Sequence, residues 1–140
     1  MANIYALKGN HDTGKTETLK KLYALLVNKY KISNKQINEL PTDRWDIKII
    51  ISGVKGEKIG IESHGDTEKR FKQSIKYFVN EKCSIIFCTC RSRGKTVDCI
   101  EGFSSQHRVD FIQQPIISSP SKQKQNYIDM ANFLIKKSGL

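Results

Sequence analysis

Residues 9–16 read Gly9-Asn10-His11-Asp12-Thr13-Gly14-Lys15-Thr16, and the rest of the chain is organised around them. Glycines at the first and sixth positions of this stretch allow positive φ and let the backbone approach a polyanion that a Cβ atom would keep away. The lysine and threonine that follow supply an ammonium group for phosphate oxygens and a hydroxyl group for a phosphate-bound Mg²⁺. The stretch therefore predicts a phosphate-binding loop.

The sequence on either side of the loop has the periodicity that such a loop requires. The apolar run at residues 4–7 predicts a strand before it. After the loop, apolar residues recur with the spacing of an amphipathic helix at Leu19, Leu22, Tyr23, Leu26 and Tyr30. In this order, the N–H groups of the loop and the positive end of the helix dipole face the phosphates. A glycine-containing turn without a ligand is the alternative.

On these residues the chain resembles the P-loop (Walker A) nucleoside triphosphatase superfamily, and its size is similar to that of the small single-domain bacterial or phage members. The resemblance implies a nucleoside triphosphate and Mg²⁺ bound at the carboxyl ends of a mostly parallel sheet. It implies that Lys15 contacts the β- and γ-phosphates and that Thr16 binds the metal. The nucleotide contacts that it implies come from Gly9, Asn10, His11, Asp12, Thr13, Gly14, Lys15, Thr16 and Glu17.

The hydrophobic pattern of the remaining chain predicts a single α/β domain over residues 1–140. Further strands are predicted at 45–52, 59–61, 84–89 and 109–112. Further helices are predicted around 71–79, with a cap at Asp66 or Thr67, and at 96–105 and 122–137. The Gly-bearing turn at 53–58 predicts an early antiparallel hairpin, similar to that of the switch GTPases. The order of elements predicts a three-layer α/β/α sandwich with a mostly parallel sheet.

Composition limits the partners and the compartment. Lys and Arg total 24 against 14 Asp and Glu, which gives a net charge of +10. This balance favours anionic partners: nucleotides, a phosphorylated substrate or nucleic acid. The solvated lysines of an ordinary surface are the alternative, because no run of five like charges occurs. No signal segment and no bilayer-length apolar run is recognisable, so we expect a cytoplasmic protein without a membrane partner.

The four cysteines are interpreted as reduced core thiols. Their spacing, with Cys88-x-Cys90 and no nearby histidine, is not that of a zinc or redox site. Most of them lie in or beside one apolar run, where small buried hydrophobes are expected.

Two acids are candidates for the Mg²⁺ shell and for catalysis, Glu62 and Asp66. Glu62 closes an apolar strand, and Glu62-x-x-Gly65 resembles the D-x-x-G segment of switch GTPases with Glu in place of Asp. Asp66 is equally a helix cap. His64 between them would orient water or substrate, and Thr42 occupies a place comparable to that of the Mg²⁺-binding threonine of switch GTPases. An ordinary loop histidine and an ordinary loop threonine are the alternatives.

Two arginines, Arg91 and Arg93, follow the strand at 84–89 and are candidates for neutralising charge during phosphoryl transfer. A solvated loop is the alternative. No N-K-x-D segment for guanine is present, and Gln113, Gln114 and Pro115 would offer polar groups to an adenine edge. ATP is therefore favoured over GTP.

Four functions are compatible with these features. The first is a Mg²⁺-dependent ATPase acting as a switch or as part of an assembly. The second is a small-molecule or nucleotide kinase, with Asp43 or Asp46 as the base for an acceptor hydroxyl. The others are a basic nucleic-acid-binding module and a catalytically idle nucleotide-binding domain.

Overall fold

The computed structural model describes residues 1–10, 14–43, 45–63, 68–91 and 94–140. Six strands and four α-helices are formed in these ranges. The strands are β1 (Asn3–Lys8), β2 (Ile37–Glu39), β3 (Lys48–Val54), β4 (Glu57–Glu62), β5 (Ile85–Cys90) and β6 (Arg108–Gln113). The helices are α1 (Lys15–Tyr30), α2 (Glu68–Asn80), α3 (Lys95–Glu101) and α4 (Pro120–Lys137), with a 3₁₀ turn, η1 (Asn34–Gln36), before β2.

The strands form one sheet in the order β2-β3-β4-β5-β1-β6. The pairs β4/β5, β5/β1 and β1/β6 are parallel, whereas β2/β3 and β3/β4 are antiparallel. The predicted α/β fold with a mostly parallel sheet and an early hairpin is therefore confirmed. In this order β1 lies between β5 and β6, and β5 separates it from β4.

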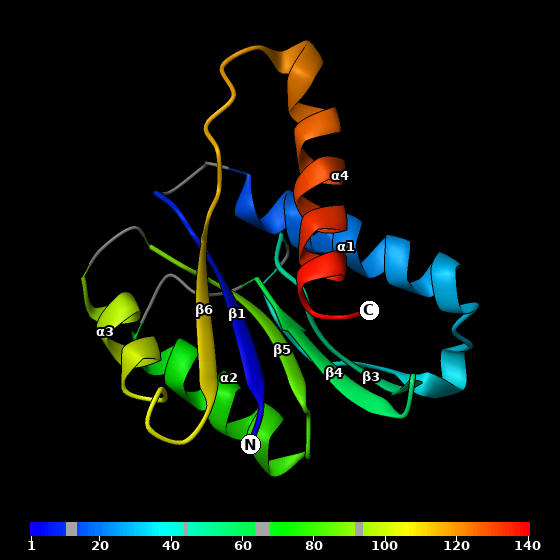
Figure 1. Cartoon of the computed structure of the whole chain (residues 1–140), viewed down its shortest axis with the longest axis vertical. Helices are drawn as coiled ribbons and strands as arrows, with labels where there is room; N and C mark the ends of the chain where they lie inside the picture. The colour runs from blue at the N-terminus through cyan, green and yellow to red at the C-terminus, as the bar shows by residue number, and fades with distance from the viewer. Residues whose placement is uncertain (11–13, 44, 64–67, 92–93) are drawn as a thin grey trace.

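Helices cover both faces of the sheet, as Figure 1 shows: α1 and α4 lie on one side, and α2 and α3 lie on the other. Each face of the sheet has its own hydrophobic core. The strands contribute to both cores because successive side chains point to opposite faces. In β1, for example, Tyr5 and Leu7 pack toward α1 and α4, while Ile4 and Ala6 pack toward α2 and α3. This is the arrangement of layers expected for a three-layer sandwich.

The early part of the sheet differs from the sequence-based prediction. No strand was predicted between the first helix and residue 45, but after the short turn η1 the chain forms the edge strand β2. Residue pairing explains the strand, because Ile37 lies opposite Ile51 of β3 and Gln36 Nε2 donates to the Ser52 carbonyl at 2.8 Å. β3 begins at Lys48, three residues later than predicted, and Trp45 is 68% exposed in the preceding loop. The predicted cap at Asp66 or Thr67 lies outside the described residues.

The cysteines behave as small buried side chains. Cys83, Cys88 and Cys90 are buried and Cys99 is half-buried, and all four are free thiols. Burial raises the pKa of the Cys83 and Cys90 thiols to about 11 and that of Cys88 well above its ordinary value. Because thiolate is the reactive form, these three are chemically inert near neutral pH.

No helix in the described ranges is both long enough and apolar enough to cross a bilayer.

Candidate functional site

The parallel strands bring β1, β5 and β6 to a common carboxyl edge. Lys8 at the end of β1 lies level with Cys90 of β5 and with Gln113 of β6. Beyond the strands, the Gly9 N–H donates to the Cys90 carbonyl at 3.2 Å, and the Gln114 N–H donates to the Lys8 carbonyl at 2.8 Å. The chain leaves β1 at this edge and α1 starts at Lys15. The strand and the helix that the phosphate-binding motif requires are both present.

Gly14 is the residue before α1, and its backbone conformation favours glycine. Its φ is +90°, which an L side chain rarely adopts, whereas Gly9 is not among the described residues with positive φ. A Cβ atom at Gly14 would also lie 2.3 Å from Cε1 of Tyr127 on α4. The conformational prediction thus holds for Gly14 and not for Gly9. Tyr127, which was not predicted as a residue of this site, lies directly against Gly14.

Lys15 is almost completely buried, with 7% of its surface exposed. Its Nζ donates to the Gly9 carbonyl at 2.6 Å and to the Cys90 carbonyl at 2.9 Å. These bonds hold the ammonium group at the carboxyl edge, between the first residue of the loop and the end of β5. The positive charge that the motif predicts for bound phosphates is therefore located beside the loop.

Thr16 contacts an acid that was considered from the sequence only as a possible base. Its hydroxyl donates to Asp46 Oδ1 at 3.4 Å, and the Ser63 hydroxyl donates to the same oxygen at 2.9 Å. Ser63 is itself fixed, because its hydroxyl accepts from the Ile47 N–H at 2.9 Å. A carboxylate and two hydroxyls are the hard oxygen ligands that Mg²⁺ prefers. The oxygen chemistry of these side chains fits this ion, which Asp46 and Thr16 would hold.

Glu62 ends β4 as predicted and is 2% exposed, whereas the acid that accepts from the Thr16 hydroxyl is Asp46. Because β5 lies between β4 and β1, the backbone of Glu62 is about 10 Å from that of β1. Its side chain lines a cavity of about 370 Å³ together with Thr42 and Asp43. Asp66, the other candidate acid, lies outside the described residues, as does His64.

Three of the remaining residues that were predicted for the site, Arg91, Glu17 and Asn10, lie within the described part of the chain. Arg91 directly follows β5 at the carboxyl edge and is exposed, while Arg93 lies outside the described residues. Glu17 is exposed on α1 and forms an ion pair with Lys20 at 3.8 Å. Asn10 is exposed on the loop. His11, Asp12 and Thr13 lie outside the described residues.

The proposed adenine contacts are not equally accessible. Gln113 and Pro115 are exposed, but Gln114 is completely buried and its Oε1 accepts from the Thr18 hydroxyl at 3.1 Å. Its Nε2 has no hydrogen-bond partner among the described residues. Gln114 therefore connects the end of β6 to α1 rather than presenting its side chain to the surface.

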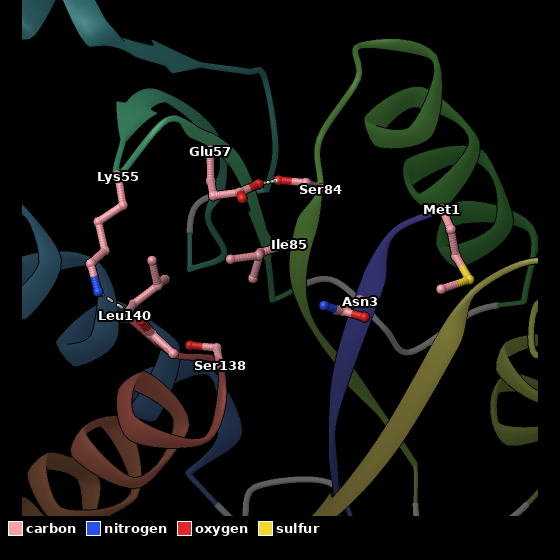
Figure 2. A pocket seen from close by; sticks show the side chains of 9 residues that line it. Met1, Asn3, Lys55, Glu57, Ser84, Ile85, Ser138 and Leu140 are labelled. Atoms are coloured by element: carbon pink, nitrogen blue, oxygen red, sulfur yellow. Dashed lines mark hydrogen bonds between the residues drawn. The ribbon is translucent and has the colours of Figure 1, made fainter.

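A second cavity, of about 480 Å³, lies at the opposite edge of the sheet, beside the starts of β1 and β5 (Figure 2). Its charged side chains are directed at neighbouring groups: Lys55 donates to the Gly139 carbonyl at 3.1 Å, and Glu57 accepts from the Ser84 hydroxyl. The first contact joins the β3–β4 turn to the C-terminal segment, and the second joins the start of β4 to the residue before β5. The two cavities thus lie at different edges, and the one lined by Glu62 is on the same side as Thr16 and Asp46.

No protein-family model, curated protein or solved structure matches the chain.

Proposed function

We propose that this protein binds a nucleoside triphosphate with Mg²⁺ at the Gly9–Thr16 loop and cleaves the bond to the γ-phosphate, with ATP as the favoured nucleotide. The observation that carries the proposal is the placement of Lys15 and Thr16. The Lys15 ammonium is buried beside the loop, and Thr16 shares an oxygen of Asp46 with Ser63. A glycine turn without a ligand needs neither arrangement, because burying an ammonium group carries a desolvation penalty.

Each residue has a chemical task in this proposal. Lys15 exchanges one or both of its carbonyl partners for phosphate oxygens, which form stronger, charge-assisted hydrogen bonds. Thr16 and Asp46 hold Mg²⁺ through oxygen, and Ser63 keeps Asp46 in position. The metal, when bound, neutralises charge on the β- and γ-phosphates. Arg91 at the end of β5, together with Arg93, stabilises charge that develops on the γ-phosphate.

Phosphoryl transfer to a small molecule is the second candidate, and the cavity beside Glu62 favours it. A hydrolase needs only a positioned water, whereas a kinase needs a separate acceptor pocket next to the phosphates. The cavity shares the loop at residues 41–47 with Asp46, which makes it the natural place for such an acceptor.

The test is thermal unfolding with Mg²⁺ and ATP, GTP, ADP or no nucleotide. A ligand that binds only the native state raises the free energy of unfolding by about 2.7 kcal/mol at one hundred times its Kd. We expect the largest rise in unfolding temperature with ATP, and loss of that rise in Lys15→Ala. Lys20→Ala, a change on the same helix away from the loop, is the matched control. An unchanged ATP-dependent shift in Lys15→Ala would contradict the proposal.

A further inference from the structure

Seven of the eight residues that line the cavity beside Glu62 have polar or charged side chains. Its walls come from residues 41–43, from Lys48 and Glu62 at the paired ends of β3 and β4, and from Arg70, Gln73 and Ser74 of α2. Its volume of about 370 Å³ is at the lower end of the range in which proteins bind small molecules, about 300–1,000 Å³. Small-molecule clefts are usually lined mainly by apolar side chains. The size and lining here point to a small, strongly polar ligand.

The charged side chains of the cavity come from the β3/β4 pair and from its exposed rim. Lys48 lies directly opposite Glu62 in the antiparallel β3/β4 pair, so the two side chains share one face of the sheet. The Lys48 ammonium also lies over the Tyr77 ring, 5.4 Å from its centroid. At the rim, Arg70 Nη1 donates to Asp43 Oδ2 at 3.0 Å.

These groups are complementary to a molecule with two different polar ends. Ammonium and guanidinium groups are the usual partners of phosphate, and a phosphate monoester presents several oxygens to both. A buried carboxylate such as Glu62, with 2% exposure, accepts a hydrogen bond from a hydroxyl group. A single ligand with a phosphate near Lys48 and Arg70 and a hydroxyl near Glu62 would be complementary in charge and hydrogen bonding to both sets of groups.

The cavity is joined to the Thr16 site by short covalent and hydrogen-bonded links. Glu62 precedes Ser63, whose hydroxyl shares Asp46 Oδ1 with Thr16. The Asp46 N–H donates to the Asp43 carbonyl at 3.1 Å. Asp43 lines the cavity and Asp46 contacts Thr16, so this hydrogen bond links the cavity to the Thr16 site. A hydroxyl bound at Glu62 would therefore lie at the same carboxyl edge of the sheet as a triphosphate at Lys15 and Thr16.

From this arrangement we propose that the cavity binds a small phosphate ester that carries a free hydroxyl group, and that this hydroxyl is the acceptor of the γ-phosphoryl group. The inference rests on the proposed function, because the nucleoside triphosphate is the phosphoryl donor. The hydroxyl oxygen forms a bond to the γ-phosphorus, and the bond from that phosphorus to the β,γ-bridging oxygen breaks. The nucleoside diphosphate leaves with that oxygen, and the hydroxyl proton passes to the Glu62 carboxylate and then to water.

The experiment measures transfer from γ-labelled ATP with Mg²⁺ to single phosphate esters. One arm contains glycerol 3-phosphate, ribose 5-phosphate and glucose 6-phosphate, and the other contains the four ribonucleoside 5′-monophosphates, so that sugar phosphates and nucleotides are distinguished. We expect label in at least one ester. Lys48→Gln and Arg70→Gln should each raise its KM about tenfold or more, as the loss of a charge-assisted hydrogen bond predicts. Lys72→Gln, an exposed change on α2 outside the cavity, is the matched control.

Two further readouts separate this inference from the proposed function. The ATP-dependent rise in unfolding temperature should be the same in Lys48→Gln and Arg70→Gln as in the unaltered protein, while Glu62→Gln should lower kcat for transfer. If ATP raises the unfolding temperature but no ester in either arm is labelled, the acceptor inference is overturned and nucleotide binding stands. An equal rise in KM with Lys72→Gln would also overturn it, because general surface charge would then explain binding. If ATP itself has no effect on unfolding, the proposed function fails first.

Discussion

Asp46 and Thr16 are separated by 30 positions in the chain, yet their side-chain oxygens lie 3.4 Å apart. The contact joins the loop before β3 to the first turn of α1, and Ser63 after β4 donates to the same carboxylate oxygen at 2.9 Å. Three segments that are distant in sequence are therefore held together by one acid. A ligand that binds at the Thr16 hydroxyl would therefore lie next to the Asp46 carboxylate.

Asp46→Asn tests whether this acid serves the metal. The substitution keeps an oxygen acceptor for Thr16 and Ser63 but removes the charge that attracts Mg²⁺. We expect a nearly unchanged unfolding temperature without nucleotide, and about a tenfold rise in the Mg²⁺ concentration that gives half of the ATP-dependent stabilisation. Asp43→Asn on the same loop is the control. A change in Mg²⁺ dependence with Glu62→Gln or Asp66→Asn, but not with Asp46→Asn, would return the metal role to those acids.

Gly14→Ala should destabilise the protein for two reasons. The residue has φ +90°, and a new Cβ would meet the Tyr127 ring at 2.3 Å. Gly56→Ala measures the cost of backbone strain without the steric clash. Gly56 has φ +75°, but a Cβ added there would have no other atom within 4 Å. Strained backbone at such a position costs about 1–2 kcal/mol. In urea unfolding we expect that loss for Gly56→Ala and a clearly larger one for Gly14→Ala, partly restored by adding Tyr127→Ala. Equal losses in the free energy of unfolding for the two variants would show that the Tyr127 side chain moves aside without destabilising the protein.

Thr18 and Gln114 form a buried side-chain pair that a double-mutant cycle can resolve. The Thr18 hydroxyl donates to Gln114 Oε1 at 3.1 Å, and both side chains are completely buried. Thr18→Val should cost about 1–3 kcal/mol, because the Gln114 amide oxygen would lose its partner in the interior. Adding Gln114→Met should recover most of this loss, since removing both polar partners leaves none unsatisfied. If the two changes are additive in urea unfolding, the hydrogen bond contributes nothing to stability.

The buried thiols predict alkaline destabilisation. Burial raises the pKa of Cys83 and Cys90 to about 11 from an ordinary value of 9.0. The unfolded chain therefore loses thiol protons at lower pH than the native protein. The free energy of unfolding should be unaffected below pH 9 and should fall as the pH rises from about 9 to 11. Cys83→Ala/Cys90→Ala should show a smaller fall over that interval. An identical slope in the variant would assign the effect to other groups.

Thiol reactivity provides an independent check on the same burial. With a disulfide reagent at pH 8 we expect the half-buried Cys99 to react first in the native protein, and all four cysteines to react in denaturant. Rapid native reaction at Cys88 would contradict the packing of β5.

Much of the fold was predictable from local pattern. The apolar run at residues 4–7 and the helical spacing from Leu19 to Tyr30 predicted β1 and α1 because each element has its own period. The hairpin was predictable from the glycines between two apolar segments. Strand β2 was not, because the residues at 37–39 become a strand only by pairing with β3, and no local pattern encodes that partner.

Part of the candidate site was also predictable from the sequence. The sequence by itself determined the G-x-x-x-x-G-K-T motif at residues 9–16, on which the proposed phosphate binding rests, because such a loop needs those residue types at a fixed spacing. The positive φ of Gly14 followed from the same requirement. Glu62 was correctly placed at the end of a buried strand, because the apolar residues before it are contiguous in the chain.

Only the tertiary structure decided which groups meet Lys15 and Thr16. Lys15 contacts the Cys90 carbonyl because β5, and not β4, is the parallel neighbour of β1. Asp46 reaches Thr16 because Ser63 and Ile47, joined across the β3/β4 pair, hold the loop end in place. Strand order and cross-strand register are properties of long-range pairing, which depends on how complete surfaces pack. The motif is therefore recognisable from consecutive residues, whereas the position of Asp46 beside Thr16 depends on the order and pairing of the strands.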